Sequence, residues 1–188
     1  DIRQAKKLEK LAVGRRIVVI GGGNTAIDIA VQSKKLGSED VSLVYRRGSQ
    51  HMSATWKEQE FAKSSGVNIK YWLSPKSLHS ENGHVSGVEF ECTKLNSEGK
   101  LSFTGESRFM EADIVFKAIG QSMQDTIFAD SEMPEIKKGK IAVNNEFETS
   151  LAGVWSGGDC VKSGEDLTVQ AVEDGKQAAN SIHQKIMQ

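Results

Sequence analysis

A short apolar run near the start of the chain is followed at once by three glycines. The continuous hydrophobicity of Ile17 to Ile20 is typical of a strand buried on both faces of a parallel sheet. Gly21, Gly22 and Gly23 then predict a turn, and apolar residues return at helical spacing from Thr25 to Leu36. Asn24 is expected to cap this helix. The face expected to be buried consists of Ala26, Ile27, Ala30 and Val31.

The pattern that follows alternates strands and helices. Val41 to Tyr45 predicts a second buried strand, and the capping-box spacing of Thr55 and Glu58 opens a helix that runs to about Ser65. Val67 to Trp72 predicts a third strand, which Pro75 is expected to end. A fourth apolar run lies at 114–118. This alternation predicts a parallel sheet with right-handed crossovers.

Between the third and fourth of these strands the periodicity changes to two. Asn82-Gly83 is a strong hairpin signal, and Val85 to Leu95 then alternates polar and apolar residues. A second turn at Glu98-Gly99 leads to a strand from Leu101 to about Met110. The expected fold class is therefore α/β, a Rossmann-like three-layer parallel sheet with an inserted antiparallel β-meander. Val88, Phe90 and Cys92 form its expected inward row.

The two ends of the chain carry weaker patterns. Asp1 to Ala12 is highly charged and predicts a connecting helix. Gly153 to Asp159 predicts an apolar strand that runs into a glycine pair and an aspartate, and Thr168 to Met187 predicts a long helix. The apolar face of that helix, expected to be its core face, consists of Val169, Val172, Ala179, Ile182 and Ile186.

Composition excludes several classes of protein. With 38% hydrophobic and 26% charged residues and a net charge of −1, the 188-residue chain has no basic excess for nucleic acid. It has no apolar run long enough to span a bilayer. Cys92 and Cys160 form no C-x-x-C pair, so no disulfide framework, iron–sulfur site or metal site is expected, and a reducing cytoplasm fits. The chain begins at Asp1 without a signal-peptide pattern and is expected to be a trimmed piece.

The glycine turn has the spacing of a dinucleotide-binding motif. Gly21, Gly23 and Ala26 give G-x-G-x-x-A between a strand and a helix, where the glycines allow a tight turn and close pyrophosphate approach. The start of the helix then offers unpaired N–H groups and the positive end of its dipole to a phosphate.

The residues after the second strand indicate which dinucleotide is bound. An NAD site would place an acidic residue about 20 positions beyond the glycines to bind the ribose 2′-hydroxyl. This chain has Arg46 and Arg47 there, and two guanidinium groups suit a 2′-phosphate, which favours NADPH. The alternatives are a solvated basic pair at a strand end, or a turn that binds another phosphate ligand or none.

The Gly157-Gly158-Asp159 sequence carries a second, weaker signal. A carboxylate after a strand suits a ribose or ribityl hydroxyl, and the helix that begins near Thr168 suits another pyrophosphate. The same three residues are also typical of a plain turn.

Three stretches together resemble a known family. They are Val18 to Asp28 with Tyr45-Arg-Arg, Ala112 to Gln121, and Val154 to Asp159 with Thr168 to Ala178. In order and spacing they are similar to the pyridine nucleotide-disulphide, FAD-dependent oxidoreductases. The most similar branch contains the glutamate synthase small subunit and the NADPH/FAD part of dihydropyrimidine dehydrogenase.

The resemblance implies roles for individual residues. The NADPH pyrophosphate would lie against the glycine turn and helix start, the 2′-phosphate against Arg46 and Arg47, and Gly120 would border the dinucleotide. Asp159, after Gly158, would bind the FAD ribityl chain, with Leu167, Thr168 and Val169 near the flavin ring or pyrophosphate. No acid–base residue is singled out. The implied cofactor-binding set is Gly21, Gly22, Gly23, Asn24, Thr25, Arg46, Arg47, Gly120, Gly158, Asp159, Leu167, Thr168 and Val169.

The resemblance also implies an activity and a domain division. Residues 1–125 would form an NADPH-binding Rossmann-like domain, and residues 126–188 the C-terminal segment of an incomplete FAD-binding domain. Hydride would pass from NADPH to FAD in the full-length oxidoreductase, and this chain alone would be inactive. The family's separate FAD glycine fingerprint and its iron–sulfur segment are not found in this sequence, so FAD is expected in the full-length protein and not in this chain. The alternative is a non-catalytic nucleotide-binding or docking module. Self-association through the C-terminal unit is a separate expectation, and the final electron acceptor stays open.

Overall fold

The fold divides into two compact units. The computed structural model describes residues 13–120, 132–164 and 167–187. The helix expected for Asp1 to Ala12 lies outside these residues. One unit comprises residues Asp1–Gly120 and the other Gln121–Gln188.

A four-stranded parallel sheet forms the centre of the first unit. Its strands are β1 (Arg16–Ile20), β2 (Asp40–Tyr45), β3 (Asn68–Tyr71) and β7 (Ile114–Lys117), in the spatial order β3-β2-β1-β7. β1 lies between β2 and β7. The chain adds β2 and β3 on one side of β1 and later adds β7 on the other side, so the strand order reverses at β1. This reversal is the place where open parallel sheets bind ligands, outside the carboxyl ends of the strands.

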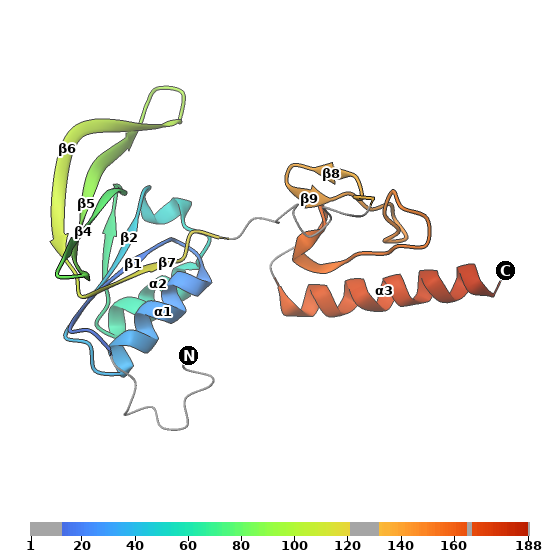
Figure 1. Ribbon diagram of the computed structural model, residues 1–188, viewed down its shortest axis with the longest axis horizontal. Coiled ribbons are helices and arrows are strands. Elements are labelled where there is room, and N and C mark those ends of the chain that lie inside the picture. Colours follow the sequence, from blue (N-terminus) through green and yellow to red (C-terminus); the bar gives the residue numbers. More distant parts are fainter. Residues whose placement is uncertain (1–12, 121–131, 165–166, 188) are drawn as a thin grey trace. The chain divides into compact units, whose positions relative to one another are not determined.

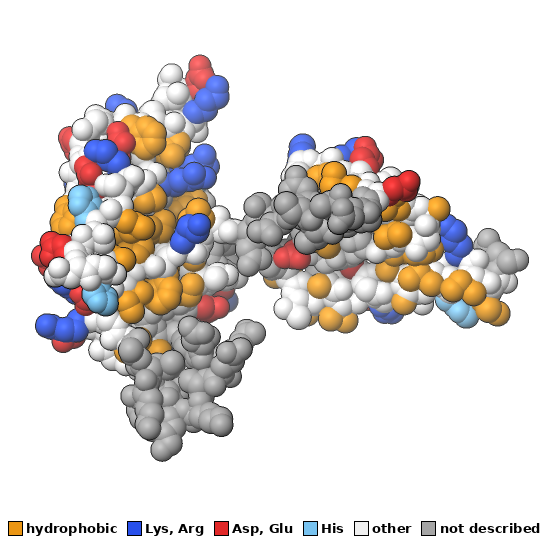
Figure 2. All heavy atoms as spheres, viewed as in Figure 1, with side chains coloured by type: hydrophobic (Ala, Val, Ile, Leu, Met, Phe, Trp, Pro, Cys, Tyr) orange, Lys and Arg blue, Asp and Glu red, His pale blue; other side chains and the backbone are white. Residues whose placement is uncertain are grey.

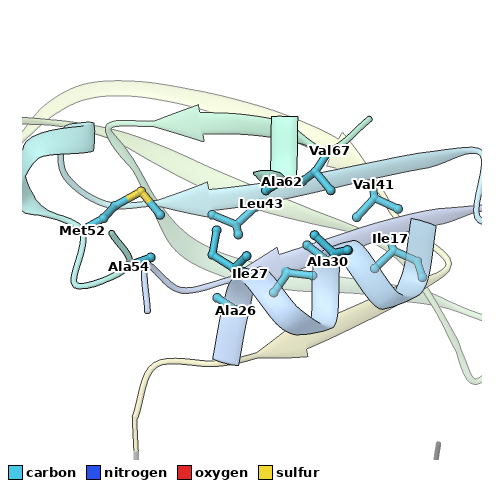
Figure 3. Close-up of a cluster of buried hydrophobic side chains, with 12 residues drawn as sticks. Ile17, Ala26, Ile27, Ala30, Val41, Leu43, Met52, Ala54, Ala62 and Val67 are labelled. Atoms are coloured by element: carbon cyan, nitrogen blue, oxygen red, sulfur yellow. The ribbon is translucent and has the colours of Figure 1, made fainter. Parts of the chain in front are cut away.

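One face of the parallel sheet is covered by two helices, α1 (Asn24–Lys35) and α2 (Trp56–Ser64), as Figure 1 shows. The predicted face of α1 is buried against the sheet, with Ala26 and Ala30 fully inaccessible, as Figure 3 shows. The small size of these alanines lets the helix axis approach the strands closely. The cluster includes Ile17, Val19, Val41 and Leu43 from the strands, with Ala62 and Val67.

The opposite face of the sheet is covered by a second sheet. It consists of β4 (Leu73–Glu81), β5 (His84–Leu95) and β6 (Leu101–Glu111), all antiparallel, in the order β4-β5-β6. Alternate residues of β1 point to opposite faces, so Val18 packs on this second sheet while its neighbours pack on α1. The predicted three-layer α/β fold is confirmed, and its third layer is the inserted meander itself. The shared core consists of Val18, Val44, Leu73, Val88, Phe90, Cys92 and Ala112.

Local sequence rules predicted several of these boundaries, and two of them fail. The capping box of α2 is present, with Thr55 N–H donating to Glu58 at 2.7 Å. Asn24, however, is the first helical residue of α1, because Gly23 occupies the N-cap position, and no side chain caps that helix. Pro75 does not end a strand: it lies inside β4, an edge strand where a missing N–H is tolerated. The third parallel strand ends earlier, at Tyr71.

The second unit contains a short hairpin and one long helix. The hairpin pairs β8 (Ile136–Lys137) with β9 (Lys140–Ile141), a single 3-10 turn η5 spans Gly158–Cys160, and α3 spans Thr168–Ile186. The strand predicted at Gly153 is reduced to one bridge residue, Trp155, paired with Glu148.

The predicted core face of α3 is wrong. Val169, Val172 and Ile186 are 76%, 68% and 76% exposed, whereas Asp174 on another face is 2% exposed. The buried face carries the Asp174 carboxylate, which accepts one hydrogen bond from Gly158 N–H in η5 and one from Gln170 on the same helix. Apolar side chains therefore follow α3 on its outer surface, as the orange groups along this helix in Figure 2 show.

Replacing Phe90 with alanine tests whether the meander layer stabilises the first unit. Phe90 is fully buried between the two sheets, so Phe90→Ala is expected to lower the free energy of unfolding by about 3–5 kcal/mol. Phe103 in β6 is 56% exposed and is the matched control, for which Phe103→Ala should change little. Urea denaturation followed by circular dichroism measures both; equal losses would contradict the layer assignment.

Candidate functional site

The glycine turn is held tightly between two strands. Gly21 N–H donates to the carbonyl of Val44 in β2 at 3.0 Å. A Cβ on Gly21 would lie 2.2 Å from the carbonyl oxygen of Ala118, and a Cβ on Gly22 would lie 2.5 Å from the Tyr45 ring. No side chain fits at either position, so a smooth stretch of backbone is presented at the carboxyl edge of the sheet.

The start of α1 is open to a ligand. Its N-cap, Gly23, has no side chain, and its carbonyl accepts the N–H groups of Ala26 and Ile27 at 3.0 and 3.2 Å. Asn24 and Thr25 are exposed. Among the described residues, no hydrogen bond engages the N–H groups of Asn24 and Thr25. Such N–H groups at the positive end of a helix dipole bind anions, so this end of α1 can hold a pyrophosphate.

A second loop supports the turn from the side. Ala54 N–H donates to the carbonyl of Gly22 at 3.0 Å, and the Ser53 hydroxyl donates to the same oxygen at 3.4 Å. This loop and the start of α2 border an open pocket of about 350 Å³, lined in part by Met52 and Trp56. No local pattern predicts these two hydrogen bonds to Gly22, because Ser53 and Ala54 lie about thirty residues from the glycines and share no motif with them.

The basic pair lies at the end of β2, next to the turn along the same sheet edge. Arg46 is exposed and Arg47 is half-buried. Within the described residues, Arg47 Nε and His51 Nδ1 are buried without a hydrogen-bond partner. The Tyr45 hydroxyl donates to the carbonyl of His51 at 2.7 Å and closes the loop between them.

A basic pair at the sheet edge that also holds an open helix start favours an anionic ligand. The glycine turn, the start of α1 and the basic pair therefore fit a dinucleotide phosphate in residue type and in position along one edge. Gly120, exposed after β7, lies at the same edge beyond the strand that neighbours β1.

The second unit brings its own predicted residues together. Gly158 N–H donates to Asp174 Oδ2 at 2.9 Å, and Gln170 Nε2 donates to Asp174 Oδ1 at 2.6 Å. A Cβ on Gly158 would lie 3.5 Å from Ala171, so η5 rests on the first turns of α3. Asp159 is exposed on this turn. Leu167 is the N-cap of α3 and makes no side-chain cap hydrogen bond, and Thr168 and Val169 follow it, exposed.

Asp174 is the functional candidate that sequence reasoning missed. Its carboxylate fixes the glycine turn that carries Asp159, although it lies sixteen residues further along the chain. In the sequence, Asp174 is one of two adjacent acidic residues in the middle of an amphipathic helix. Nothing in that pattern distinguishes it from an exposed surface carboxylate.

An ion pair with several hydrogen bonds lies at the opposite edge of the parallel sheet. Arg16 at the start of β1 donates from its backbone N–H and its guanidinium to Asp113, at 2.8 and 2.7 Å. These hydrogen bonds hold the pKa of the Asp113 carboxyl below its usual range. The pair joins the amino ends of β1 and β7 and leaves the carboxyl edge free for a ligand.

Two further observations concern the described part of the chain. No group of three or more His, Cys, Asp or Glu side chains there is placed to hold a metal ion. None of the helices in those residues has the length and apolar character needed to cross a membrane.

The family model for pyridine nucleotide-disulphide oxidoreductases matches residues 1–175. The chain belongs to this family. The match covers both units, and the predicted resemblance is confirmed, including its branch.

Curated relatives in this family are much longer than this chain. It is 35% identical over 182 residues to the NADP(+)-dependent formate dehydrogenase subunit beta of Moorella thermoacetica, with 93% of this chain and 26% of the relative covered. It is 32% identical to the glutamate synthase [NADPH] small chain of Escherichia coli, with 90% and 38% covered. The chain thus spans about a quarter to two fifths of the length of these oxidoreductases.

Solved structures share the fold at lower identity. The thioredoxin reductase of T. acidophilum superposes with a TM-score of 0.78 at 22% identity, covering 92% of this chain and 53% of that one. The enzyme from Lactococcus lactis gives 0.76 at 22% identity, covering 91% and 52%. At this identity the likeness supports the fold alone.

Replacing Asp174 tests its role in holding η5. Asp174→Ala removes both acceptor oxygens from a site 2% exposed to solvent, so the Gly158 amide should lose protection from hydrogen exchange. The expected destabilisation of the unit is about 1–3 kcal/mol. Asp159→Ala, on the same turn but exposed, is the matched control and should leave exchange unchanged. Unaltered protection in Asp174→Ala would contradict the assignment.

Proposed function

We propose that this chain is the NADPH-binding portion of a flavin-dependent oxidoreductase in which hydride passes from NADPH to FAD. The observation that carries the proposal is the position of Arg46 and Arg47 directly after β2, at the sheet edge that holds the glycine turn. The family and the names of two relatives, one NADP(+)-dependent and one using NADPH, support the same cofactor.

The proposed roles of the first unit follow from its geometry. The N–H groups at the start of α1 hold the pyrophosphate, and the backbone of Gly21 and Gly22 allows it to approach. Arg46 and Arg47 grip the 2′-phosphate, which a guanidinium can do through two parallel hydrogen bonds. Bound NADPH supplies the hydride, while the protein holds and orients the nucleotide.

The second unit is proposed to contribute a smaller part of a flavin site. Asp159 would bind a ribityl hydroxyl, and the open N-terminus of α3, from Leu167 to Val169, would face the pyrophosphate or the ring. Further FAD contacts, and the acceptor of the electrons, would come from segments or subunits outside this sequence. The proposed setting is a multi-subunit enzyme in the cytoplasm.

Removing the basic pair tests the proposed cofactor. The double variant Arg46→Ala, Arg47→Ala should weaken NADPH binding by about 1–3 kcal/mol for each charged hydrogen bond lost. NADH affinity should change far less, because NADH lacks the 2′-phosphate. Isothermal titration with both nucleotides measures the difference.

Arg108→Ala is the matched control for this experiment. Arg108 is an exposed arginine on β6, away from the carboxyl edge of the parallel sheet, and its removal should leave both affinities unchanged. Equal losses of NADPH and NADH affinity in the double variant would argue against a 2′-phosphate contact.

Thermal shifts with each cofactor test how much of the flavin site the chain holds. A ligand at 100 times its dissociation constant stabilises the folded state by roughly 2.7 kcal/mol. We expect a weak but measurable shift with NADPH and little or none with FAD. A large shift with FAD and none with NADPH would refute the proposed division of roles.

A second candidate function is a non-catalytic docking module, which the exposed apolar face of α3 favours. Val169, Val172, Ile186 and Met187 are each more than two-thirds exposed, and an apolar stripe of this kind is typical of a protein interface. A protein that binds NADPH and self-associates in sedimentation would favour this candidate. A protein that binds NADPH and stays monomeric would favour the portion of an enzyme.

A further inference from the structure

The backbone of the basic pair is fixed by a residue from the inserted meander. The Thr93 hydroxyl donates to the carbonyl of Arg46 at 2.8 Å, although the two residues lie 47 positions apart. The next carbonyl, of Arg47, accepts the N–H of Trp72 at 3.3 Å. The backbone carbonyls of Arg46 and Arg47 therefore both accept hydrogen bonds from residues outside the four-stranded parallel sheet.

Thr93 and Trp72 are also joined to each other. Thr93 N–H donates to the carbonyl of Trp72 at 2.9 Å, so one threonine uses both its backbone and its side chain at this point. Thr93 is 5% exposed. It lies next to an irregularity between β5 and β6: Glu91 pairs with Ser107 and Thr93 pairs with Phe103, so the extra residues are on β6. Thr93 itself keeps its place in the β5 ladder.

Trp72 has an uncommon backbone conformation. Its φ is 63°, in the left-handed region that bulky residues rarely adopt. Its indole lies 2.9 Å from where a Cβ on Gly48 would stand, and its ring meets His51 edge-on with the centroids 6.1 Å apart. The tryptophan thus packs on the loop that follows Arg47, and backbone strain of this kind persists only where surrounding contacts enforce it.

We propose that Thr93 and Trp72 form a brace that positions Arg46 and Arg47, and so makes Thr93 a positioning residue for the choice between NADPH and NADH. The inference rests on the proposed NADPH function. The physical argument is that a bidentate guanidinium–phosphate contact requires a fixed backbone, because two parallel hydrogen bonds tolerate little displacement. The glycine turn, proposed to hold the rest of the nucleotide, is also hydrogen-bonded to Val44 in β2, so it depends less on the brace than Arg46 and Arg47 do.

The decisive variants are Thr93→Val and Thr93→Ser. Valine keeps the shape of threonine and removes the hydroxyl, whereas serine keeps the hydroxyl. In Thr93→Val we expect the dissociation constant for NADPH to rise about three- to tenfold, the usual effect of one lost hydrogen bond, with NADH unchanged. Thr93→Ser should restore the preference. Thr104→Val, at an exposed threonine of β6, is the matched control and should have no effect.

A second readout needs no nucleotide. Hydrogen exchange of the segment 46–53 in the ligand-free protein should become faster in Thr93→Val and return toward the original rate in Thr93→Ser. An unchanged exchange rate in Thr93→Val would overturn the brace, whatever the affinities do. Faster exchange with an unchanged ratio of NADPH to NADH affinity, in a chain that prefers NADPH, would overturn its role in specificity.

The two readouts separate this inference from the function on which it rests. If the unmodified chain does not prefer NADPH, while Thr93→Val still loosens the segment, the proposed cofactor is wrong and the brace stands as a structural device. If the unmodified chain prefers NADPH and neither readout moves in Thr93→Val, the cofactor assignment stands and the brace is wrong.

Discussion

The close approach of backbone to backbone at Gly21 is the constraint on which the first unit depends. The Gly21 N–H donates a hydrogen bond to the carbonyl of Val44 in β2. The carbonyl of Ala118, after β7, occupies the space that a side chain on Gly21 would need. The turn is therefore fixed against the strands on both sides of β1. Because the turn is fixed, the start of α1 is fixed as well, and its N–H groups point into the place where the sheet order reverses. The open helix start at this position therefore follows from backbone packing alone.

The two faces of the parallel sheet serve different purposes. The face covered by α1 and α2 supplies the helix N-terminus that suits a phosphate. The other face is covered by the meander, whose core residues Val88 and Phe90 are fully buried against it. Because β5 packs on this face, Thr93 lies at the end of β2, where its hydroxyl donates a hydrogen bond to the carbonyl of Arg46. The third layer thereby links the hydrophobic core to the basic pair.

The sequence predicted the features that local rules determine and missed those that depend on distant contacts. The glycine turn, the buried strands β1 and β2, the capping box at Thr55 and the inward row of β5 follow from spacing within a few residues, and the structure confirms them. The strand β7 is present as predicted but is only half-buried. The cap at Asn24 was wrong because two adjacent residues can each start a helix, and Gly23 occupies the position here. Thr93, Trp72 and Asp174 were missed, since their roles arise from hydrogen bonds to residues 16 to 47 positions away or from a backbone conformation that no motif announces.

On α3 a carboxylate is buried while most of the predicted apolar face is exposed. Val169, Val172 and Ile186 are exposed, although burial of such a side chain is worth about 1.5–3 kcal/mol. Asp174 is buried instead, and both of its oxygens accept hydrogen bonds, one from Gly158 N–H and one from Gln170 on the same helix. Without these donors the carboxylate could not be buried, because an unpaired buried charge is strongly unfavourable. Amphipathic pattern predicts which residues a helix can bury, but the face that a small unit buries also depends on where its polar groups find partners.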